Sequence, residues 1–318
     1  MANPEVPERS ARLLAAALRS GLQQEAPNDY GLAPLEAVHD ARYLHFLQNI
    51  YKRWSRIEGA SAEVLPNVHP DRRNGTYPKS AVGHVGYHIY DASCPIAAGT
   101  WEGARWSANS AVHAANIVLG GEAACYALAR PPGHHAGSDL VGGFCFLNNS
   151  AIAAHILRSA HERVAILDVD VHHGNGTQDI FYERGDVLTV SIHADPVRFY
   201  PFFWGYADER GAGDGQDANY NFPLPRGTND DDYLPVLDEA IARVRKFKPG
   251  ALVVALGLDA YVNDPYQGFA ITTPGFARIA ARIAALNLPT VLVQEGGYLS
   301  DGLGANLESF LQGFNHQD

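Results

Sequence analysis

The chain has 318 residues, of which 24 are Lys or Arg and 35 are Asp or Glu, so its formal net charge is −11. With 46% hydrophobic and 19% charged residues, its composition is that of a folded globular protein and excludes a disordered polymer. The acidic balance argues against a nucleic-acid binder or an anionic-membrane binder, since either needs a basic surface. It is compatible with a small cationic substrate.

Three widely spaced cysteines, Cys94, Cys125 and Cys145, fit neither a disulfide framework nor a C-x-x-C metal knuckle. The N-terminal segment lacks the apolar region of a signal peptide, and no run approaches the ~20 apolar residues of a membrane span. We therefore expect a reduced, cytoplasmic protein that binds no membrane. Because no linker, repeat or low-complexity tract interrupts the sequence, we expect residues 1–318 to form one domain.

Helical and strand-like segments alternate along most of the chain. The N-terminal part has helical periodicity as far as about residue 60, whereas residues 61–100 have no period and are interpreted as a long surface or interface loop. Beyond this loop we predict helices over 102–119, 148–160, 230–247 and 273–287, strands over 125–130, 164–171, 187–193, 251–258 and 290–296, and a loop-rich stretch over 195–228. The strands are apolar almost throughout, as strands buried on both faces are. The alternation predicts an α/β fold with a parallel sheet that has helices on both faces.

Two of the predicted helices carry start signals. Asp230 to Asp232 place negative charge at the beginning of one helix, where the helix dipole favours it. Thr273 and Pro274 are typical of an N-cap followed by the first helical residue of the other.

Titratable side chains follow several of the predicted strands. In an open parallel sheet, ligands bind at the carboxyl ends of the strands, so these groups are expected to meet at one edge. Asp168, Asp170 and His172 alternate with apolar residues and would point to one side while the strand persists, and Asp259 follows a neighbouring strand. Carboxylates and an imidazole that leave a coordination position open are typical of a catalytic zinc site. The alternative is that these carboxylates only cap helices or form ion pairs.

A tandem pair, His134-His135, follows a Pro-Pro-Gly turn, and neighbouring rings in an extended loop are expected to point in different directions. Near a metal site, histidine is the obvious general acid or base at neutral pH. Tyr298 follows a double-glycine turn, and its hydroxyl is a candidate donor to an oxyanion. Surface histidines and a packed tyrosine are the alternatives.

Other chemistries are disfavoured. Gly174-x-Gly176 lacks the third glycine of a dinucleotide fingerprint. Cys145 has no flanking basic residue and is expected to be a buried thiol. Ser191 lacks the G-x-S-x-G elbow of a serine hydrolase.

Six ordered motifs, RPPGHHAG, GGFCFLNN, ILDVDVHHGNGTQDIFYERGDV, SIHADP, LGLDAY and QEGGY, resemble the histone deacetylase superfamily, and most of all its bacterial acetylpolyamine amidohydrolase and class II-like branches. The resemblance begins near residue 35 and continues to the C-terminus. It implies a single deacetylase catalytic domain with the arginase–deacetylase fold, an eight-stranded parallel sheet flanked by helices.

The resemblance also implies roles for individual residues. It implies that Asp170, His172 and Asp259 are the ligands of one zinc ion, for which Fe2+ or Co2+ could substitute. It implies that His134 and His135 are catalytic histidines, and that Asp168 and Asn175 hold their other ring nitrogens. It implies that Tyr298 polarises the carbonyl of the substrate. It places Phe144, Tyr200, Tyr266, Gly143 and Gly296 along a substrate tunnel. It places a structural K+ at Asp168, Asp170, His172, Ser191 and Ile192, held partly by backbone carbonyls.

The activity implied is zinc-dependent hydrolysis of N-acetylated amines, most of all acetylpolyamines or related small amines, by metal-activated water, with His135 as general base. The alternative is a protein-lysine deacylase of the class II type, which a channel narrowed by residues 61–100 across a homodimer interface would exclude. The intact Tyr298 and histidine pair argue against a non-catalytic binding protein. Asn175 argues against a binuclear ureohydrolase, which would need a further carboxylate.

The sequence departs from the family pattern in two places. The chain starts in helical sequence and not in the usual short N-terminal strand, so we expect an altered sheet edge. Where polyamine-selective relatives carry acids, this chain has Val82 and Ser93, with Asp91 as the only nearby acid. These positions do not support selectivity for polyamines. Tyr200 and Tyr266 are expected to make the entrance aromatic, so a flatter N-acyl substrate is an alternative.

Overall fold

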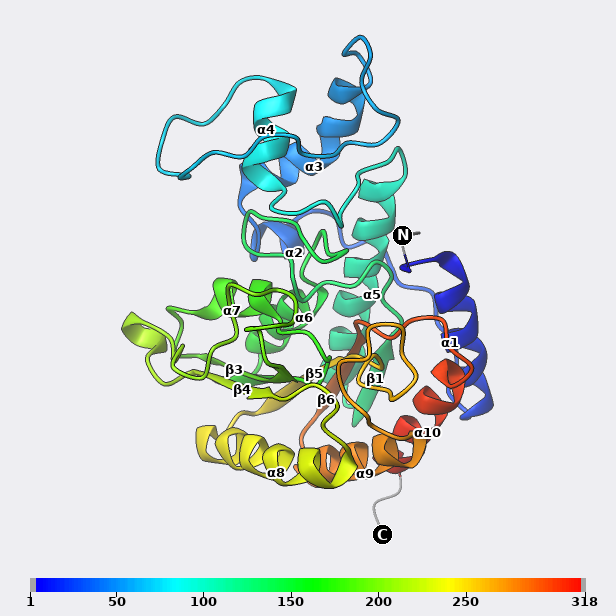
Figure 1. The fold of residues 1–318 in the computed structure, drawn as a ribbon. Helices are drawn as coiled ribbons and strands as arrows, with labels where there is room; N and C mark the ends of the chain where they lie inside the picture. Colours follow the sequence, from blue (N-terminus) through cyan, green and yellow to red (C-terminus); the bar gives the residue numbers. More distant parts are fainter. Residues whose placement is uncertain (1–3, 316–318) are drawn as a thin grey trace.

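The computed structural model describes residues 4–315 and has three layers, with a parallel sheet between two layers of helices (Figure 1). The helices are α1 (Pro7–Arg19), α2 (Ala33–Glu36), α3 (Ala41–Trp54), α4 (Ala81–His88), α5 (Thr100–Leu119), α6 (Asn149–Arg158), α7 (Asn175–Phe181), α8 (Asp230–Phe247), α9 (Thr273–Ala284) and α10 (Leu303–Asn315). The strands are β1 (Ala124–Ala127), β2 (Val164–Asp168), β3 (Val187–Ala194), β4 (Asn219–Leu224), β5 (Ala251–Leu256) and β6 (Thr290–Gln294), with a short 3-10 helix, η1, at Gly213–Gly215.

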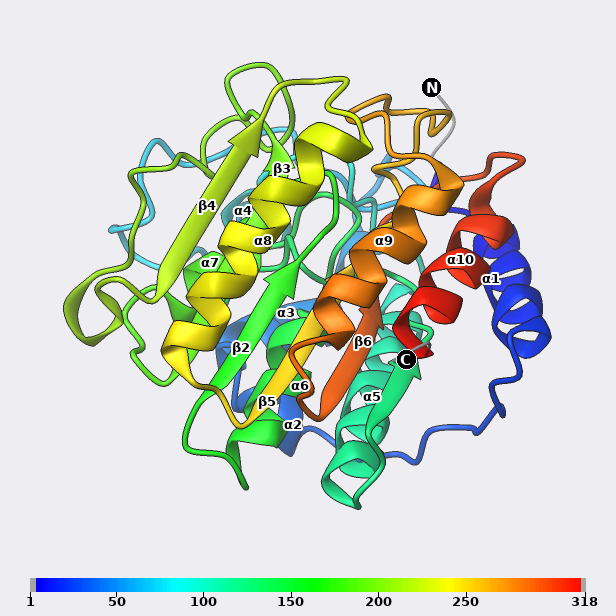
Figure 2. The same cartoon turned by 90° about the horizontal axis from the view of Figure 1, so that it is seen from below.

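The sheet has the strand order β1-β6-β5-β2-β3-β4, and every neighbouring pair is parallel. Helices α8 and α9 cover one face, and α5 and α6 cover the other (Figure 2). The α/β class is therefore confirmed. The expectation of eight strands is wrong for residues 4–315, which form six. Strand β1 is an edge of the sheet, and the segment between α1 and α2 forms no strand that pairs with it.

Alternate residues of the central strands enter two separate hydrophobic cores. In β2, Val164 and Ile166 belong to the core that contains residues of α5 and α6, whereas Ala165 and Leu167 belong to the core that contains residues of α8 and α9. Every residue of β2, β3, β5 and β6 is buried. Strands covered on both faces favour apolar side chains, which explains why β5 is apolar throughout. Strand β3 departs from this pattern, since its buried Thr189, Ser191 and His193 alternate with apolar residues.

Helix α8 coincides with the predicted segment 230–247. The Asn229 side chain accepts hydrogen bonds from the backbone N–H groups of Asp231 and Asp232, and the three aspartates fill the first turn. The cap predicted for α9 is displaced by one residue, because the hydroxyl of Thr272, not Thr273, accepts from Gly275 N–H.

Two segments interpreted as loops contain regular structure. The 61–100 region includes α4, which the N-cap Ser80 begins and whose glycines and histidines hide its helical character in the sequence. The 195–228 stretch includes β4, an edge strand in which the polar Asn219 and Asn221 interrupt the apolar pattern. Both segments were predicted to be loops from their local composition, whereas contacts with other parts of the protein stabilise α4 and β4.

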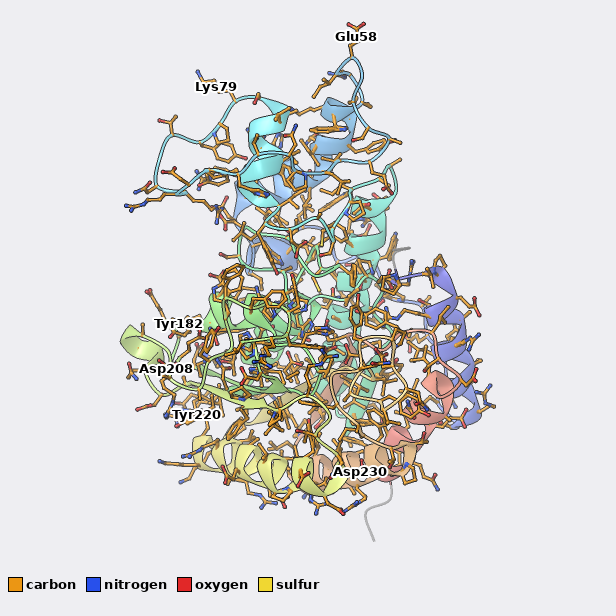
Figure 3. All side chains as sticks on the ribbon, in the orientation of Figure 1. Glu58, Lys79, Tyr182, Asp208, Tyr220 and Asp230 are labelled. Atoms are coloured by element: carbon orange, nitrogen blue, oxygen red, sulfur yellow. The ribbon has the colours of Figure 1, made fainter. Side chains whose placement is uncertain are left out.

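Helices α3 and α4 and the adjoining loops stand above the sheet layers, and Glu58 and Lys79 mark the outer end of this projection (Figure 3). Among residues 4–315, no helix is both long and apolar enough to cross a membrane.

Candidate functional site

The predicted catalytic and metal-binding residues lie at or beyond the carboxyl ends of β1, β2, β5 and β6. Strand β2 ends at Asp168 and not at residue 171 as predicted, so Asp170 lies with His172 in the irregular segment that follows the strand. The structure nevertheless brings Asp170, His172 and Asp259 together, because β5 is the neighbour of β2 in the sheet.

These three side chains form a compact, buried cluster. His172 Nδ1 lies 3.1 Å from Asp170 Oδ1 and 3.1 Å from Asp259 Oδ2. Backbone N–H groups fix both carboxylates, since Gly296 donates to Asp170 Oδ2 at 2.7 Å and Val171 donates to Asp259 Oδ1 at 3.0 Å. One ligand atom from each of the three side chains lies within 4.8 Å of the other two, which is close enough for the three to hold one ion.

The electrostatics of the cluster favour a cation. Burial lowers the pKa of His172, but its hydrogen bonds to Asp170 and Asp259 more than offset burial and raise that pKa to about 9. Burial and the charge of Asp170 raise the pKa of Asp259 to about 6. The carboxylates of Asp170 and Asp259 are thus both buried next to the His172 ring, where a positive charge stabilises them. Two carboxylate oxygens and one imidazole nitrogen are a donor set that suits a divalent metal.

The tandem histidines both point into this site, so the expectation that their rings diverge is wrong. The ring centroids of His134 and His135 lie 4.0 Å apart. The two rings have different partners: His134 Nδ1 lies 2.9 Å from Asp168 Oδ2, and His135 Nδ1 lies 2.7 Å from Asn175 Oδ1. Asp168 at the end of β2 and Asn175 at the start of α7 thus hold the two rings toward the site.

The different partners separate the pKa values of the two rings. Burial lowers the pKa of His134, yet Asp168 and Asp170 outweigh burial and raise it to about 10. Burial and the neighbouring His134 and His172 lower the pKa of His135 well below its usual range. The two pKa values are therefore shifted in opposite directions, which is how a site separates an acid from a base.

Tyr298 is buried beside the cluster, and an unforeseen residue holds it there. Burial and the charge of Asp259 raise the pKa of its phenol well above the usual range, so the hydroxyl remains a proton donor. Arg9 of α1 is 1% exposed, and its guanidinium lies 5.0 Å from the centre of the Tyr298 ring. Arg9 also donates to the carbonyls of Gly297 at 2.5 Å and Glu295 at 2.7 Å.

The residues expected along a tunnel surround the site. Tyr200 and Tyr266 place their rings against the His172 ring, with centroids 6.2 and 5.2 Å away. Phe144 lies 6.1 Å from the Tyr298 ring. Gly143 and Gly296 allow close approach, because a Cβ atom would lie 2.2 Å from His135 Cδ2 in one case and 2.1 Å from Asp259 Oδ2 in the other.

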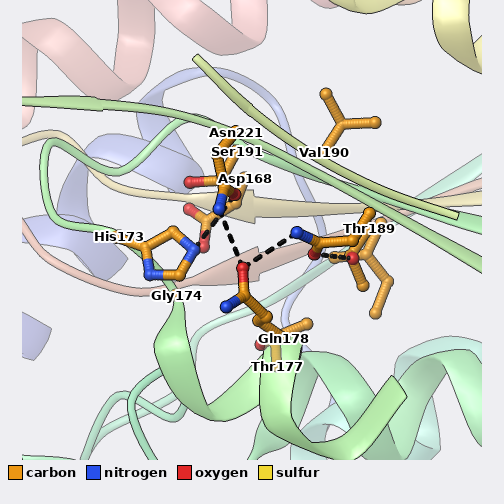
Figure 4. A pocket seen from close by; sticks show the side chains of 11 residues that line it. Asp168, His173, Gly174, Thr177, Gln178, Thr189, Val190, Ser191 and Asn221 are labelled. Atoms are coloured by element: carbon orange, nitrogen blue, oxygen red, sulfur yellow. Dashed lines mark hydrogen bonds between the residues drawn. The ribbon is translucent and has the colours of Figure 1, made fainter. Parts of the chain in front are cut away.

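Two of the residues expected at a potassium site line a small polar cavity. Asp168 pairs with Ser191 in the register of β2 and β3, and both line a cavity of about 10 Å³ (Figure 4). Amide and hydroxyl groups of Gln178, Asn221 and neighbouring side chains line the same cavity. Ile192 is fully buried in the core on β3.

Sequence reasoning missed Arg9, Glu295 and Phe199. Glu295 Oε2 accepts from the backbone N–H groups of Gly133 and His134, at 2.6 and 3.0 Å, and so fixes the histidine turn. Its place directly after β6 was a usable signal. Phe199 stacks on the His172 ring, with centroids 5.0 Å apart. Arg9 lies more than 280 residues from Glu295 and Gly297, and nothing local to Arg9 indicates these contacts. Cys145 is a buried thiol, as predicted.

Comparisons with known families, sequences and structures all identify proteins of the histone deacetylase type. The profile of the histone deacetylase domain matches residues 3–314. The acetylpolyamine amidohydrolase of Burkholderia pseudomallei is 49% identical over 98% of this chain and 91% of its own length, and acetylpolyamine amidohydrolase 1 of Pseudomonas aeruginosa is 46% identical over the same shares. The crystal structure of the B. pseudomallei acetylpolyamine aminohydrolase superposes with a TM-score of 0.95 at 49% identity, over 98% of this chain and 91% of that one. The crystal structure of the HDA15 HD domain superposes with a TM-score of 0.81 at 26% identity, over 97% of this chain and 81% of that one.

Proposed function

The chain belongs to the histone deacetylase domain family, and from this premise we propose that it is a metal-dependent amidohydrolase of small N-acetylated amines. The observation that carries the proposal is the meeting of Asp170, His172 and Asp259 with the His134-His135 pair in one buried site. Four of its relatives are named acetylpolyamine amidohydrolases.

The proposed metal ligands are Asp170, His172 and Asp259, and the ion we propose is zinc, with Fe2+ or Co2+ as substitutes. When bound, such an ion polarises the amide carbonyl and makes water a stronger acid. The close approach of the Gly296 backbone supports this assignment, since a larger residue would occupy the space of both carboxylates.

The side chains around the ligands supply the proton transfers. Neutral His135 is proposed to accept the proton of the attacking water at Nε2, because its Nδ1 is engaged by Asn175. Cationic His134, stabilised by Asp168, is proposed to donate a proton to the leaving amine. The Tyr298 hydroxyl is proposed to donate a hydrogen bond to the oxygen on which negative charge develops.

The channel walls bear on substrate choice. We propose that Phe144, Tyr200 and Tyr266 enclose the acyl-bearing chain, with the backbones of Gly143 and Gly296 beside it. Both oxygens of Asp91 are already engaged by Ser93, Gly143 and Tyr200, so this acid is not free to hold a distant ammonium group. We therefore propose short acetylated amines as substrates.

We propose a homodimer in which the projection of one copy covers the channel mouth of the other. Residues 41–100 carry seven Lys or Arg and four Asp or Glu, a net charge of +3, whereas the rest of the chain carries −14. The exposed Phe203, on the loop that carries Tyr200, offers an apolar contact at 76% exposure. Opposite charges on two regions of one chain favour association of two copies.

Two further proposals concern the surroundings of the site. We propose a structural K+ near Asp168 and Ser191, which the polar cavity beside them supports. We also propose a reducing, cytoplasmic compartment, which agrees with the unpaired state of Cys94, Cys125 and Cys145.

The proposal is tested by acetate release from acetylputrescine and acetylspermidine with zinc-loaded enzyme. Tyr298→Phe and His135→Ala should each lose turnover by about 100-fold or more while keeping one zinc per chain. Tyr206→Phe is the matched control, because its hydroxyl only donates to the Phe202 carbonyl on the loop surface. Wild-type rates in either site variant would refute the assignment.

A further inference from the structure

A chain of hydrogen bonds leads from Asp91 to His135, the proposed general base. The Tyr200 hydroxyl donates to Asp91 Oδ2 at 2.5 Å, and the hydroxyls of Tyr90 and Tyr200 lie 2.7 Å apart. Asn175 Nδ2 lies 3.4 Å from the Tyr90 hydroxyl, and Asn175 Oδ1 lies 2.7 Å from His135 Nδ1. Four consecutive contacts therefore connect Asp91 to His135.

The chemistry of Asp91 sets the direction of every bond in this chain. An ionised carboxylate only accepts, so Tyr200 must donate to it. Tyr200 has one proton and has used it, so Tyr90 must donate to the Tyr200 oxygen. The Tyr90 oxygen is then an acceptor, and it faces the Asn175 amide.

This direction decides which way the Asn175 amide is turned. Only the NH2 group can donate to Tyr90, which leaves the amide oxygen towards His135. His135 must then carry its proton on Nδ1, and Nε2 keeps its lone pair. An isolated asparagine would not enforce this choice, since its oxygen and nitrogen exchange places on a flip.

We propose that Asp91, Tyr90 and Tyr200 are positioning residues that fix the tautomer of His135, so that Nε2 is a proton acceptor. None of the three needs to touch the reacting atoms. The proposal rests on the proposed function only for its kinetic consequence, because the tautomer is a property of the protein itself.

The surroundings hold the chain of hydrogen bonds in place. The other Asp91 oxygen accepts from the Ser93 backbone N–H at 2.9 Å and from its hydroxyl at 2.5 Å, so the carboxylate cannot turn away. The Tyr90 ring fills the space above Gly142, where a Cβ atom would lie 1.9 Å from the ring. Trp204 packs on the Tyr90 ring, with centroids 5.7 Å apart. Burial raises the pKa of Tyr200 well above its usual range and keeps its donor proton in place.

The first test reads the tautomer directly. In the zinc-loaded, 15N-histidine-labelled protein near pH 7, the His135 signals are assigned by their loss in His135→Asn. We expect a protonated Nδ1 and an unprotonated Nε2 in the wild type, and a mixture of tautomers in Tyr90→Phe and in Tyr200→Phe. A single Nδ1–H tautomer that persists in both variants overturns the proposal, whether or not the chain hydrolyses acetylated amines.

The second test measures the consequence for catalysis. Tyr90→Phe should lower kcat about tenfold and leave KM within about twofold, as expected for the loss of a partner that orients a reacting group. Tyr206→Phe should change neither constant, because its hydroxyl lies outside the chain of hydrogen bonds. In an Asn175→Asp background, Tyr90→Phe should cost less than twofold, since a carboxylate accepts from His135 whichever way it turns. An equal loss in both backgrounds, or no loss in either, contradicts the proposal.

Discussion

The contact between Arg9 and the Tyr298 turn yields a prediction with two measurable parts. Arg9 is 1% exposed, donates to the carbonyls of Glu295 and Gly297, and pairs with Glu5 at 2.7 Å. We consider Arg9→Met, which keeps the length and apolar character of the stem and removes the guanidinium.

The expected loss of stability follows from these contacts. A hydrogen bond to a charged group is worth about 1.5–3 kcal/mol, so two such bonds represent about 3–6 kcal/mol. The desolvation of the guanidinium, no longer required in the variant, offsets part of this loss. Glu5 keeps a second partner, Arg130, at 3.0 Å. We therefore expect the free energy of unfolding in urea to fall by about 3 kcal/mol.

The expected loss of activity follows from the freedom gained by Tyr298. Removing a donor to an oxyanion lowers kcat by about 100- to 1,000-fold. When the donor is still present but is loosely held, we expect a smaller decrease in kcat. We expect kcat on an acetylated amine to fall 10- to 100-fold with one zinc still bound per chain. Arg12→Met is the matched control on the same helix, since Arg12 is 45% exposed and pairs with the exposed Glu8 and the Ser300 carbonyl. Arg9→Met with kcat within twofold of the wild type would refute the reasoning.

Three further outcomes are expected. Gly296→Ala should lose zinc, measured by metal content after dialysis, because its Cβ would overlap Asp259 and Asp170; Gly75→Ala, with open space around it, should keep it. Burial lowers the pKa of His39 and of His88 to about 4. Because the unfolded chain binds their protons from about pH 6.5 downwards, stability should fall between pH 6.5 and 4 by about 1.4 kcal/mol per pH unit for each ring. Urea unfolding at pH 7 and 5 measures this loss, and equal values would contradict it. Glu295→Gln should lower kcat about tenfold in the acetate assay, since Glu295 fixes the turn before His134.

The hydrogen bonds of His39 show why its neutral form is the native one. Its Nδ1 donates to the Gly137 carbonyl at 3.0 Å, and its Nε2 accepts from Asn148 N–H at 3.0 Å. A proton on Nε2 would remove the acceptor and leave a buried N–H donor without a partner. The loss of stability at low pH therefore follows from geometry as well as from burial.

Sequence predicted the parts of the fold that local pattern determines. The central strands β2 and β5 are mostly apolar because both faces are covered, and the three aspartates predicted to begin a helix do fill the first turn of α8. The irregular sequence of α4 and the polar strand β4 could not be recognised, because packing and strand pairing stabilise them and their own sequences do not. The number of strands was inferred from resemblance, and the structure has six in residues 4–315.

The candidate site was predictable where chemistry follows the strand ends. Asp170, His172 and Asp259 meet because β2 and β5 are neighbours, which parallel-strand geometry favours. The direction of the two imidazoles was not predictable, since it depends on Asp168 and Asn175 arriving from different elements. Arg9 and the chain from Asp91 to His135 depend on contacts between distant segments, which no local pattern encodes.

The most direct test of the central claim compares kcat/KM for acetylputrescine with kcat/KM for an acetyl-lysine peptide, using zinc-loaded enzyme. We predict that acetate is released from the small amine with at least about tenfold higher kcat/KM, and that Asp259→Asn removes both the zinc and the activity. Preference for the peptide would favour a protein-lysine deacylase. Zinc-loaded enzyme that releases acetate from neither substrate would contradict the account.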